Sequence, residues 1–168
     1  DILTGKVCPS GRLTMTWPIF ATDHPSTKNF PQDMPLFSYE AIQNYSDAGV
    51  PGRDFTNHDE DIWVGYRYFD TWNKDVAYPF GYGLSYTTFE FGKPTVKKVG
   101  DKITVSVSVK NTGNVAGKEV AQVYVAAPNG SIEKPEKELK AFGKTNLLQP
   151  GETQTLQMTI AQRDLASF

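Results

Sequence analysis

The chain of 168 residues contains few of the residues on which several protein classes depend. It has a single cysteine, Cys8, which excludes an internal disulfide framework, and its two histidines lack the spaced partners of a structural zinc site. No stretch approaches about 18 uninterrupted apolar residues, so we expect no membrane span. The 17 basic and 19 acidic residues give a net charge of -2 without a run of five like charges, which excludes the basic surface of a nucleic-acid binder.

Aromatic and basic residues are distributed unevenly along the chain. Residues 1–92 hold 18 of the 21 Phe, Trp and Tyr residues, whereas 10 of the 13 lysines lie from Lys93 onward. Gly92 and Pro94 also interrupt the chain at this point. With a hydrophobic content of 39%, the chain can bury one ordinary core or two small ones. We therefore predict two units, residues 1–92 and 93–168.

The first unit shows little regular periodicity. Residues 1–5 resemble the last turn of a helix, because Gly5 is the residue type favoured just past a helix end. Residues 13–17 alternate apolar and polar side chains, which predicts a half-buried strand. Residues 19–58 have no lasting period, and a loop of about forty residues far exceeds the usual 4–6, so it is either functional or packs on a body outside this sequence. Residues 62–70 are rich in aromatic and β-branched residues, which predicts a strand buried on both faces.

The second unit is regular. Residues 102–110 place isoleucine and valine at every second position, which is the clearest strand pattern in the chain. Further strands are expected at residues 119–127, 137–147 and 153–160. Strands at short, turn-separated intervals predict an antiparallel β-sandwich, although four or five strands are fewer than the usual seven or so. Both ends of the sequence therefore look like interruptions of larger elements.

Three stretches resemble the C-terminal part of the family 3 glycoside hydrolases, which include β-glucosidases and β-xylosidases. They are residues 1–18 (DILTGKVCPSGRLTMTWP), residues 62–91 (IWVGYRYFDTWNKDVAYPFGYGLSYTTFEF) and residues 109–142, with their NTGN and KPEKELKAF elements. Residues 78–88 are the most specific, because a string so dense in aromatic residues and glycines rarely recurs by chance.

The resemblance implies a parent enzyme with a (β/α)8 barrel that carries a nucleophilic aspartate, an α/β-sandwich domain that carries an acid/base glutamate, and a fibronectin type III-like domain. Residues 1–92 would be the C-terminal part of the α/β-sandwich domain with a long loop and linker. Residues 93–168 would be a truncated fibronectin type III-like domain. The implied fold is mainly β, an incomplete immunoglobulin/fibronectin III-like antiparallel β-sandwich preceded by a remnant of the α/β-sandwich domain.

Both carboxyl groups that retaining hydrolysis of a β-glycosidic bond requires would lie outside this chain. We therefore expect no catalytic residue here, and the chain should be inactive alone. No metal and no cofactor are expected either. The runs at residues 59–61 and at Asp70 and Asp75 are interpreted as solvated or turn-capping carboxylates. Cys8 is not expected to be a nucleophile, and His24 and His58 are interpreted as surface residues.

Trp17, Trp63 and Trp72 are the candidate substrate-binding residues, because an indole ring can stack on a sugar. Packing in a core or between domains is the alternative for these rings, since Trp17 and Trp63 fall inside expected strands. Arg67 lies within an apolar stretch, where an unpaired guanidinium is costly to bury. It should either reach a carboxylate such as Glu60 or Asp70, or point at a domain interface.

Two functional hypotheses remain. In the first, the chain is a non-catalytic C-terminal part of a β-glucosidase-like parent and braces its catalytic domains. In the second, it is a stand-alone carbohydrate-binding or cell-surface interaction module; a purely structural spacer is a third option. The expected partners are the upstream catalytic domains, an oligosaccharide or β-glycoside bound through the parent, and a second copy in a homo-oligomer. The parent is expected to be periplasmic or secreted, with a cytoplasmic location left open.

Overall fold

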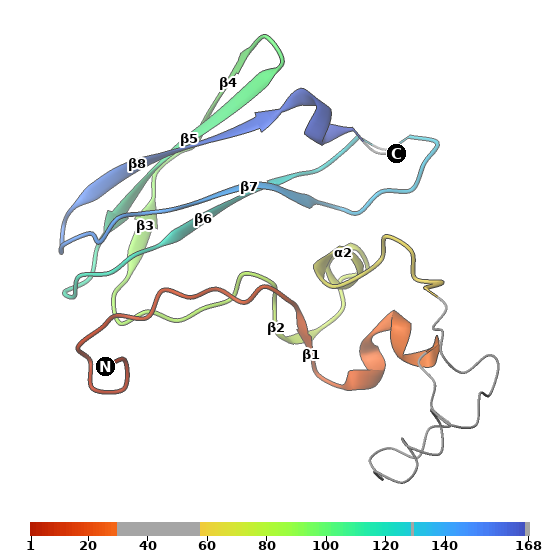
Figure 1. Ribbon diagram of the computed structural model, residues 1–168, viewed down its shortest axis with the longest axis horizontal. Helices are drawn as coiled ribbons and strands as arrows, with labels where there is room; N and C mark the ends of the chain where they lie inside the picture. Colours follow the sequence, from red (N-terminus) through yellow and green to blue (C-terminus); the bar gives the residue numbers. More distant parts are fainter. Residues whose placement is uncertain (30–57, 129, 167–168) are drawn as a thin grey trace, which may run out of the picture.

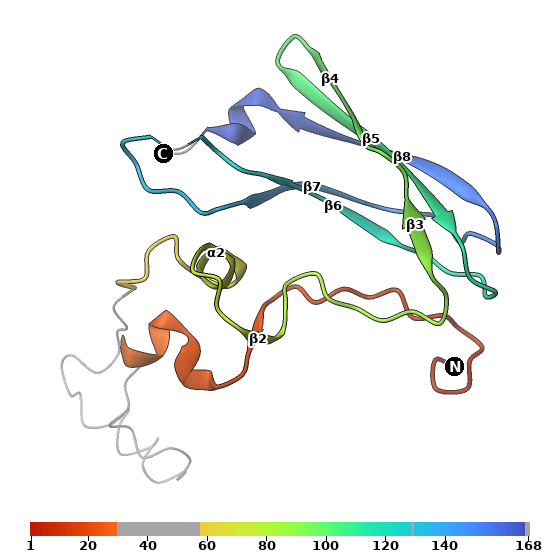
Figure 2. The ribbon, with the colours of Figure 1, turned by 180° about the vertical axis from the view of Figure 1, so that it is seen from behind.

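The structure, a computed structural model, describes residues 1–29, 58–128 and 130–166. These residues form three layers (Figure 1): a four-stranded sheet, a two-stranded sheet, and a less regular layer that contains the N-terminal residues and the helix. Seen from behind, the two-stranded sheet again lies between the other two layers (Figure 2). The chain is therefore mainly β and antiparallel, as the sequence predicts.

The elements follow one another with short connections through most of the described chain. The strands are β1 (Trp17–Pro18), β2 (Val76–Tyr78), β3 (Phe89–Phe91), β4 (Thr95–Val99), β5 (Lys102–Asn111), β6 (Val120–Val125), β7 (Glu138–Lys144) and β8 (Thr153–Ala161). The helices are α2 (Tyr66–Thr71) and 3-10 turns at Ala21–Asp23, Pro25–Asn29 and Gln162–Leu165.

The larger sheet is built around β5. β8 pairs with β5 along its whole length, whereas β3 and β4 share the other edge, β3 opposite residues 109–111 and β4 opposite residues 102–106. The apolar residues of the predicted alternation face inward, where Val105 is opposite Met158 and Val107 is opposite Leu156. Each such buried side chain contributes about 1.5–3 kcal/mol. The predicted strands at residues 102–110 and 153–160 are thereby confirmed.

The smaller sheet, β6 and β7, closes the core from the other side. Its pairing contains an irregularity between Val123 and Tyr124 and continues beyond the strands as a bridge between Gly117 and Leu148. Ala121 joins Val107, Val109, Leu156 and Met158 in the buried cluster between the sheets. Strands were expected at residues 119–127 and 137–147, and both are present with somewhat narrower bounds.

Asn111 joins the sandwich to the segment that precedes it. Its side chain is completely buried, and all of its polar atoms are used. The Oδ1 atom accepts hydrogen bonds from Thr87 Oγ1 (2.6 Å) and from the Gly113 N–H (3.1 Å). The Nδ2 group donates to the carbonyls of Val115 (2.8 Å) and Leu148 (2.9 Å). One side chain therefore fixes two loops, those between β5 and β6 and between β7 and β8, and the residues just before β3.

The strand predicted at residues 62–70 is wrong. Gly65 has a φ of 55°, which breaks an extended path, and residues 66–71 then form α2. Tyr68 and Trp72, four residues apart, bring their ring centroids to 5.0 Å, as neighbours on a helix surface do. β-propensity measures how side chains fit a half-buried pleated surface, and here the aromatic side chains pack around a helix instead.

The strand predicted at residues 13–17 is also largely wrong. Only Trp17 and Pro18 form β1, which pairs with β2. Leu13 instead forms two backbone hydrogen bonds with residues 81 and 82, its N–H donating to Tyr82 and its carbonyl accepting from Gly81 (both 2.8 Å). Isolated contacts of this kind tie two extended segments together without forming a ladder.

The turn at the start follows the sequence interpretation. Gly5 has a φ of 74°, and the N–H groups of Gly5 and Lys6 donate to the carbonyls of Ile2 and Asp1. This pair of bonds is the Schellman arrangement that closes helical turns. The expected loop at residues 19–58 lies mostly outside the described residues. The boundary between Gly92 and Lys93 stays a prediction, and β3, which lies before it, belongs to the larger sheet.

Candidate functional site

The contact between α2 and the smaller sheet is formed by aromatic rings, hydrogen bonds and ion pairs. Tyr66 on α2 places its ring 4.9 Å from that of Phe80 and 5.7 Å from that of Tyr124 on β6. Its hydroxyl accepts a hydrogen bond from the Leu139 N–H (2.9 Å), and the Thr71 hydroxyl accepts one from the Glu136 N–H (3.0 Å). Two hydroxyl groups of α2 therefore accept hydrogen bonds from backbone N–H groups of β7 and of the residues just before it.

Two ion pairs cross the same contact. Arg67 Nη2 lies 3.0 Å from Glu138 Oε1, and Lys137 Nζ lies 3.1 Å from Asp70 Oδ2. Lys140 Nζ binds the second oxygen of Glu138 at 3.1 Å. Arg67 therefore pairs with a carboxylate on β7 and points at the interface between the two parts of the chain. The suggested pairing with Glu60 or Asp70 is not the one found.

A third ion pair joins the N-terminal residues to the start of β6. Arg12 Nη2 contacts Glu119 Oε1, and both side chains are largely buried. Glu119 Oε1 also accepts the Val120 N–H (2.6 Å), and Lys144 Nζ donates to the Ser10 carbonyl (2.9 Å). Removing one partner of a buried pair leaves a charge without compensation, so this pair should be harder to break than those around α2, which are partly exposed.

Tyr124 is the titratable group that the contact changes. Burial, the neighbouring Tyr66 and the Asp70 carboxylate, in that order, raise the pKa of the Tyr124 phenol above its usual value. The Tyr124 hydroxyl donates to Gln122 Oε1 (3.2 Å), and Lys137 Nζ lies 5.6 Å from the centre of its ring. The phenol, in the middle of the contact, therefore keeps its proton to a higher pH than a free tyrosine does.

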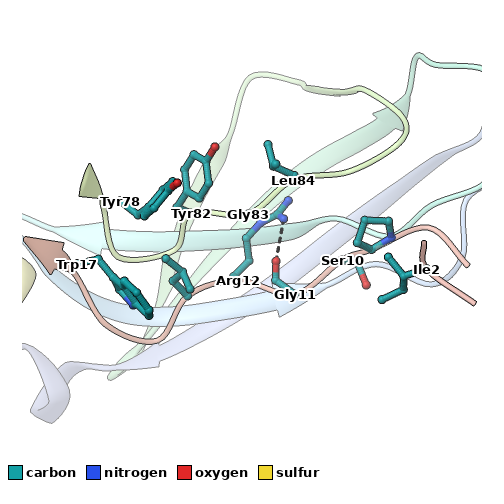
Figure 3. Close-up of a pocket in the computed structure, with 11 residues that line it drawn as sticks. Ile2, Ser10, Gly11, Arg12, Trp17, Tyr78, Tyr82, Gly83 and Leu84 are labelled. Atoms are coloured by element: carbon teal, nitrogen blue, oxygen red, sulfur yellow. Dashed lines mark hydrogen bonds between the residues drawn. The ribbon is translucent and has the colours of Figure 1, made fainter. Parts of the chain in front are cut away.

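An aromatic groove lies on the N-terminal part of the molecule (Figure 3). It has a volume of about 660 Å³ and is mostly apolar. Trp17 lies on one side of it, and Tyr78 and Tyr82, with ring centroids 5.0 Å apart, lie on the other. The remaining lining residues are Ile2, Pro9, Ser10, Gly11, Arg12, Leu13, Gly83 and Leu84. Trp17 is 52% exposed, so its ring is available to a neighbouring group.

A separate aromatic cluster lies around the end of α2. The rings of Trp63 and Trp72 have centroids 4.6 Å apart and planes at 72°, and Tyr68 contacts Trp72 as well. A pocket of about 310 Å³ is lined by Trp63 and Trp72 together with Ile132, Glu133 and Lys134. Because the two indole planes are steeply inclined, they do not form a flat platform for a sugar chain.

The structure thus separates the three candidate tryptophans. Trp17 lies in the aromatic groove, while Trp63 and Trp72 lie together beside α2. Trp63 is half-buried by its partner, and Trp72 remains 48% exposed. The assignment of these rings to substrate binding stays a prediction.

The other residues singled out in the sequence lie apart from one another. Cys8 Sγ lies 3.2 Å from the Ser85 hydroxyl, and the His24 ring contacts that of Phe69. His58 is exposed and binds Glu60 through Nδ1 (2.9 Å). Glu60 is itself buried, so the interpretation of residues 59–61 as a solvated cluster is wrong for that residue. In residues 1–29, 58–128 and 130–166, no cluster of at least three His, Cys, Asp or Glu side chains could hold a metal ion.

None of the helices in the described part of the chain is both long and apolar enough to cross a membrane.

Sequence reasoning missed the β7 side of the contact with α2. Glu138 and Lys137 lie in the KPEKELKAF element, and their partners Arg67 and Asp70 lie in the YRYFD element. Opposite charges in two aromatic-rich elements were the available signal. It could not identify the pairs, because about seventy residues separate the two elements and any of several charges could have met.

The comparisons with known proteins cover the whole chain. The Fibronectin type III-like domain family matches residues 119–168. A β-glucosidase from Ruminococcus albus is 44% identical over 168 residues, which are 99% of this chain and 16% of that protein. β-Glucosidase 3B from Thermotoga neapolitana, solved in complex with glucose, has a TM-score of 0.81 and 46% identity, with 100% of this chain and 21% of that chain covered.

A family 3 β-glucosidase from Bifidobacterium adolescentis has a TM-score of 0.81 and 37% identity, with 98% of this chain and 22% of that chain covered. The chain therefore spans only about a fifth of the length of the relatives and solved structures that it matches.

Proposed function

We propose that this chain, which is the C-terminal portion of a family 3 glycoside hydrolase, is non-catalytic and braces the catalytic domains of its parent enzyme. The similarity of the whole chain to about a fifth of several β-glucosidases supports this proposal. The parent would hydrolyse β-glycosidic bonds with retention of configuration. The residues before Lys93 would close the α/β-sandwich domain, and those after it would form the fibronectin type III-like domain.

The carboxylates of the chain support a structural role. Retaining hydrolysis needs two carboxyl groups about 5–5.5 Å apart that face a substrate cleft, one as nucleophile and one as acid/base. Glu119, Glu138 and Asp70 are instead bound to basic side chains across the contact between the two parts of the chain. These carboxylates therefore hold two segments together, and both catalytic groups of the parent would come from its upstream domains.

The observation that carries the proposal is the contact between α2 and β7. The sandwich has its own buried core, and α2 is attached to it by aromatic rings, backbone hydrogen bonds and ion pairs. A segment fixed to a rigid sheet in this way keeps one orientation. The sandwich would thus position the aromatic groove, which we propose as the surface that contacts the upstream domains.

The direct test is activity of the purified chain toward p-nitrophenyl β-glucoside. We expect no turnover, because neither catalytic carboxyl group belongs to this chain. Turnover that disappears when one of its own carboxylates, for example Asp75, is replaced by the matching amide would overturn the proposal. Glu90→Gln, on an edge of the larger sheet, is the matched control for a change of surface charge.

The stand-alone binding module remains the second candidate function. The half-exposed Trp72, next to a pocket that Glu133 and Lys134 line, is the observation in its favour. Titration of the chain with a soluble β-glucan, followed by tryptophan fluorescence, tests it. Binding that Trp72→Ala abolishes and Trp17→Ala leaves intact would support it, and an unchanged spectrum would exclude it.

We also propose that the chain self-associates. Large apolar side chains are exposed on both of its parts, including Leu84 at 70% and Phe142 at 70%. Exposed apolar surface of this extent commonly marks an interaction site. Light scattering at increasing protein concentration tests the proposal, and a mass that stays at that of one chain would exclude it.

A further inference from the structure

The helix α2 covers one end of the outer edge of β7. In the described part of the chain β7 pairs with β6, and the Leu139 N–H instead donates to the hydroxyl of Tyr66 (2.9 Å). Just before the strand, the Glu136 N–H donates in the same way to the Thr71 hydroxyl (3.0 Å). Two side-chain oxygens of a helix therefore take the place of the carbonyl groups that a neighbouring strand supplies.

The contact involves four successive residues at this edge and one face of α2. Residues four apart are neighbours on a helix surface, so residues 66 and 70 lie side by side, as do residues 67 and 71. The contacts follow the two segments in opposite order: Tyr66 with Leu139, Arg67 with Glu138, Asp70 with Lys137 and Thr71 with Glu136. One whole face of the helix is thus used to cover residues 136–139.

Without the helix, this edge is suited to pair with the same edge of a second copy. About a twofold axis, the outward N–H and carbonyl of Leu139 meet those of its counterpart, and two residues placed in this way exchange two hydrogen bonds. Glu138 then lies opposite Lys140 of the second copy, and opposite charges across a strand pair are favourable. Residues 138–144 contain no proline that would prevent such pairing.

We propose that α2 is a removable cover of the β7 edge, which keeps this edge from pairing with β7 of a second copy. The ion pairs that hold the helix are partly exposed and contribute little each. The helix has six residues, and helices shorter than about 12–15 residues are marginal in water on their own. The inference goes beyond the proposed bracing, and it differs from the proposed self-association, which uses exposed side chains of the intact fold.

A double variant, Tyr66→Phe with Thr71→Val, removes both acceptor oxygens and keeps the ring of residue 66 in contact with Phe80 and Tyr124. Tyr68→Phe removes a hydroxyl from the same helix that accepts no hydrogen bond from β7, and is the matched control. At about 1 μM, we expect the Leu139 amide to exchange several-fold faster in the double variant than in the wild type. The control should exchange like the wild type.

Sedimentation equilibrium of the same 168-residue chains measures the pairing. We expect the double variant to reach the mass of two chains at a concentration at least about tenfold lower than the wild type and the control do. As its concentration rises, the Leu139 amide should become protected again, because it then donates to the second copy. Protected amides of β8 in these samples show that the sandwich is folded.

Three outcomes would overturn the inference. Unchanged exchange of the Leu139 amide in the dilute double variant would mean that α2 does not cover the edge. Equal association of the double variant and the wild type would exclude the pairing, even if both self-associate through their apolar side chains. Stronger association that leaves the Leu139 amide unprotected would place the contact on another surface. If the double variant does not fold, Tyr66→Phe alone takes its place with the same outcomes.

Discussion

The described residues before and after Gly92 bury their apolar side chains to very different extents. Of the nine buried hydrophobic residues, eight lie after Gly92, and Phe69 is the exception. Of the 21 large hydrophobic residues that are exposed, 15 lie before it. The first part nevertheless holds nearly all of the aromatic residues of the chain.

This difference shows that aromatic content and core formation are separate properties. The second part forms two sheets with a common core, so its apolar side chains cover one another. The described residues of the first part form one short helix, a two-residue strand and two three-residue strands, of which β3 belongs to the larger sheet, and this part gains its order by contact with the sandwich. The first part therefore depends on a neighbour for its stability, whereas the sandwich is stabilised by its own buried core.

The largest effect is expected at Asn111, where the two parts meet. Asn111→Ala removes four side-chain hydrogen bonds in a fully buried position, so the Thr87 hydroxyl and the Val115 carbonyl lose their Asn111 partner, while the Leu148 carbonyl keeps only the Gly117 N–H. Each buried unsatisfied group costs about 1–3 kcal/mol, so the free energy of unfolding should fall by more than about 3 kcal/mol. Urea unfolding measures it. The exposed Asn114→Ala is the control, and similar values for both variants would contradict the prediction.

The next largest loss of stability should be confined to the first part of the chain. Phe69→Ala removes the buried side chain of α2, at a cost of about 3–5 kcal/mol if the whole chain unfolds as one unit. Because all three tryptophans lie before Gly92, fluorescence reports on the first part, while hydrogen exchange of β8 reports on the sandwich. We expect the free energy of unfolding reported by fluorescence to fall well below the one reported by hydrogen exchange of β8. A common shift of both would show that the two parts unfold together.

A smaller effect is expected from the ion pair between Arg67 and Glu138. A double-mutant cycle with Arg67→Ala and Glu138→Ala should give a coupling energy of about 0.5–1 kcal/mol, because both side chains are partly exposed. The same cycle with Arg67→Ala and Glu152→Ala, on a distant turn, should give none. Coupling of equal size in both cycles would mean that the pair does not join the two parts directly.

The smallest effect concerns the pH dependence of the contact. The pKa of Tyr124 is raised in the folded protein, so the folded state keeps the phenol proton to a higher pH than the unfolded chain does. This contribution is complete below the unfolded value of about 10 and is lost as the pH rises through the folded value. Tyr124→Phe should therefore lose less stability than the wild type between pH 9 and pH 11 in urea unfolding, about one pH unit to either side of that value. Parallel curves would contradict the assignment.

Residues of the sandwich could be placed from the sequence to within a few positions. β5 and β8 each alternate apolar and polar residues, and the period of two fixes which residues face the core wherever one face is buried. The short strands β2, β3 and β4 were missed. β4 has no buried residue, so it carries no alternation that a pattern could detect.

The candidate site could be predicted less well from the sequence than the sandwich. Trp17, Trp63 and Trp72 were treated as one group, but the first lies in the aromatic groove and the other two beside α2. Arg67 was expected either to pair or to reach an interface, and it does both through Glu138. Neither arrangement has a local pattern, because each depends on which distant segments come together.

The sequence by itself determined the antiparallel β-sandwich, the inward residues of its longest strands and the resemblance to family 3 glycoside hydrolases. Only the tertiary structure decided that residues 66–71 form a helix and that this helix is attached to β7. The reason is physical. Burial of one face of a strand imposes an alternation of apolar and polar residues, and this pattern can be read from neighbouring residues. The partner of a charge or a ring depends instead on which segments, far apart in the chain, come together in the fold.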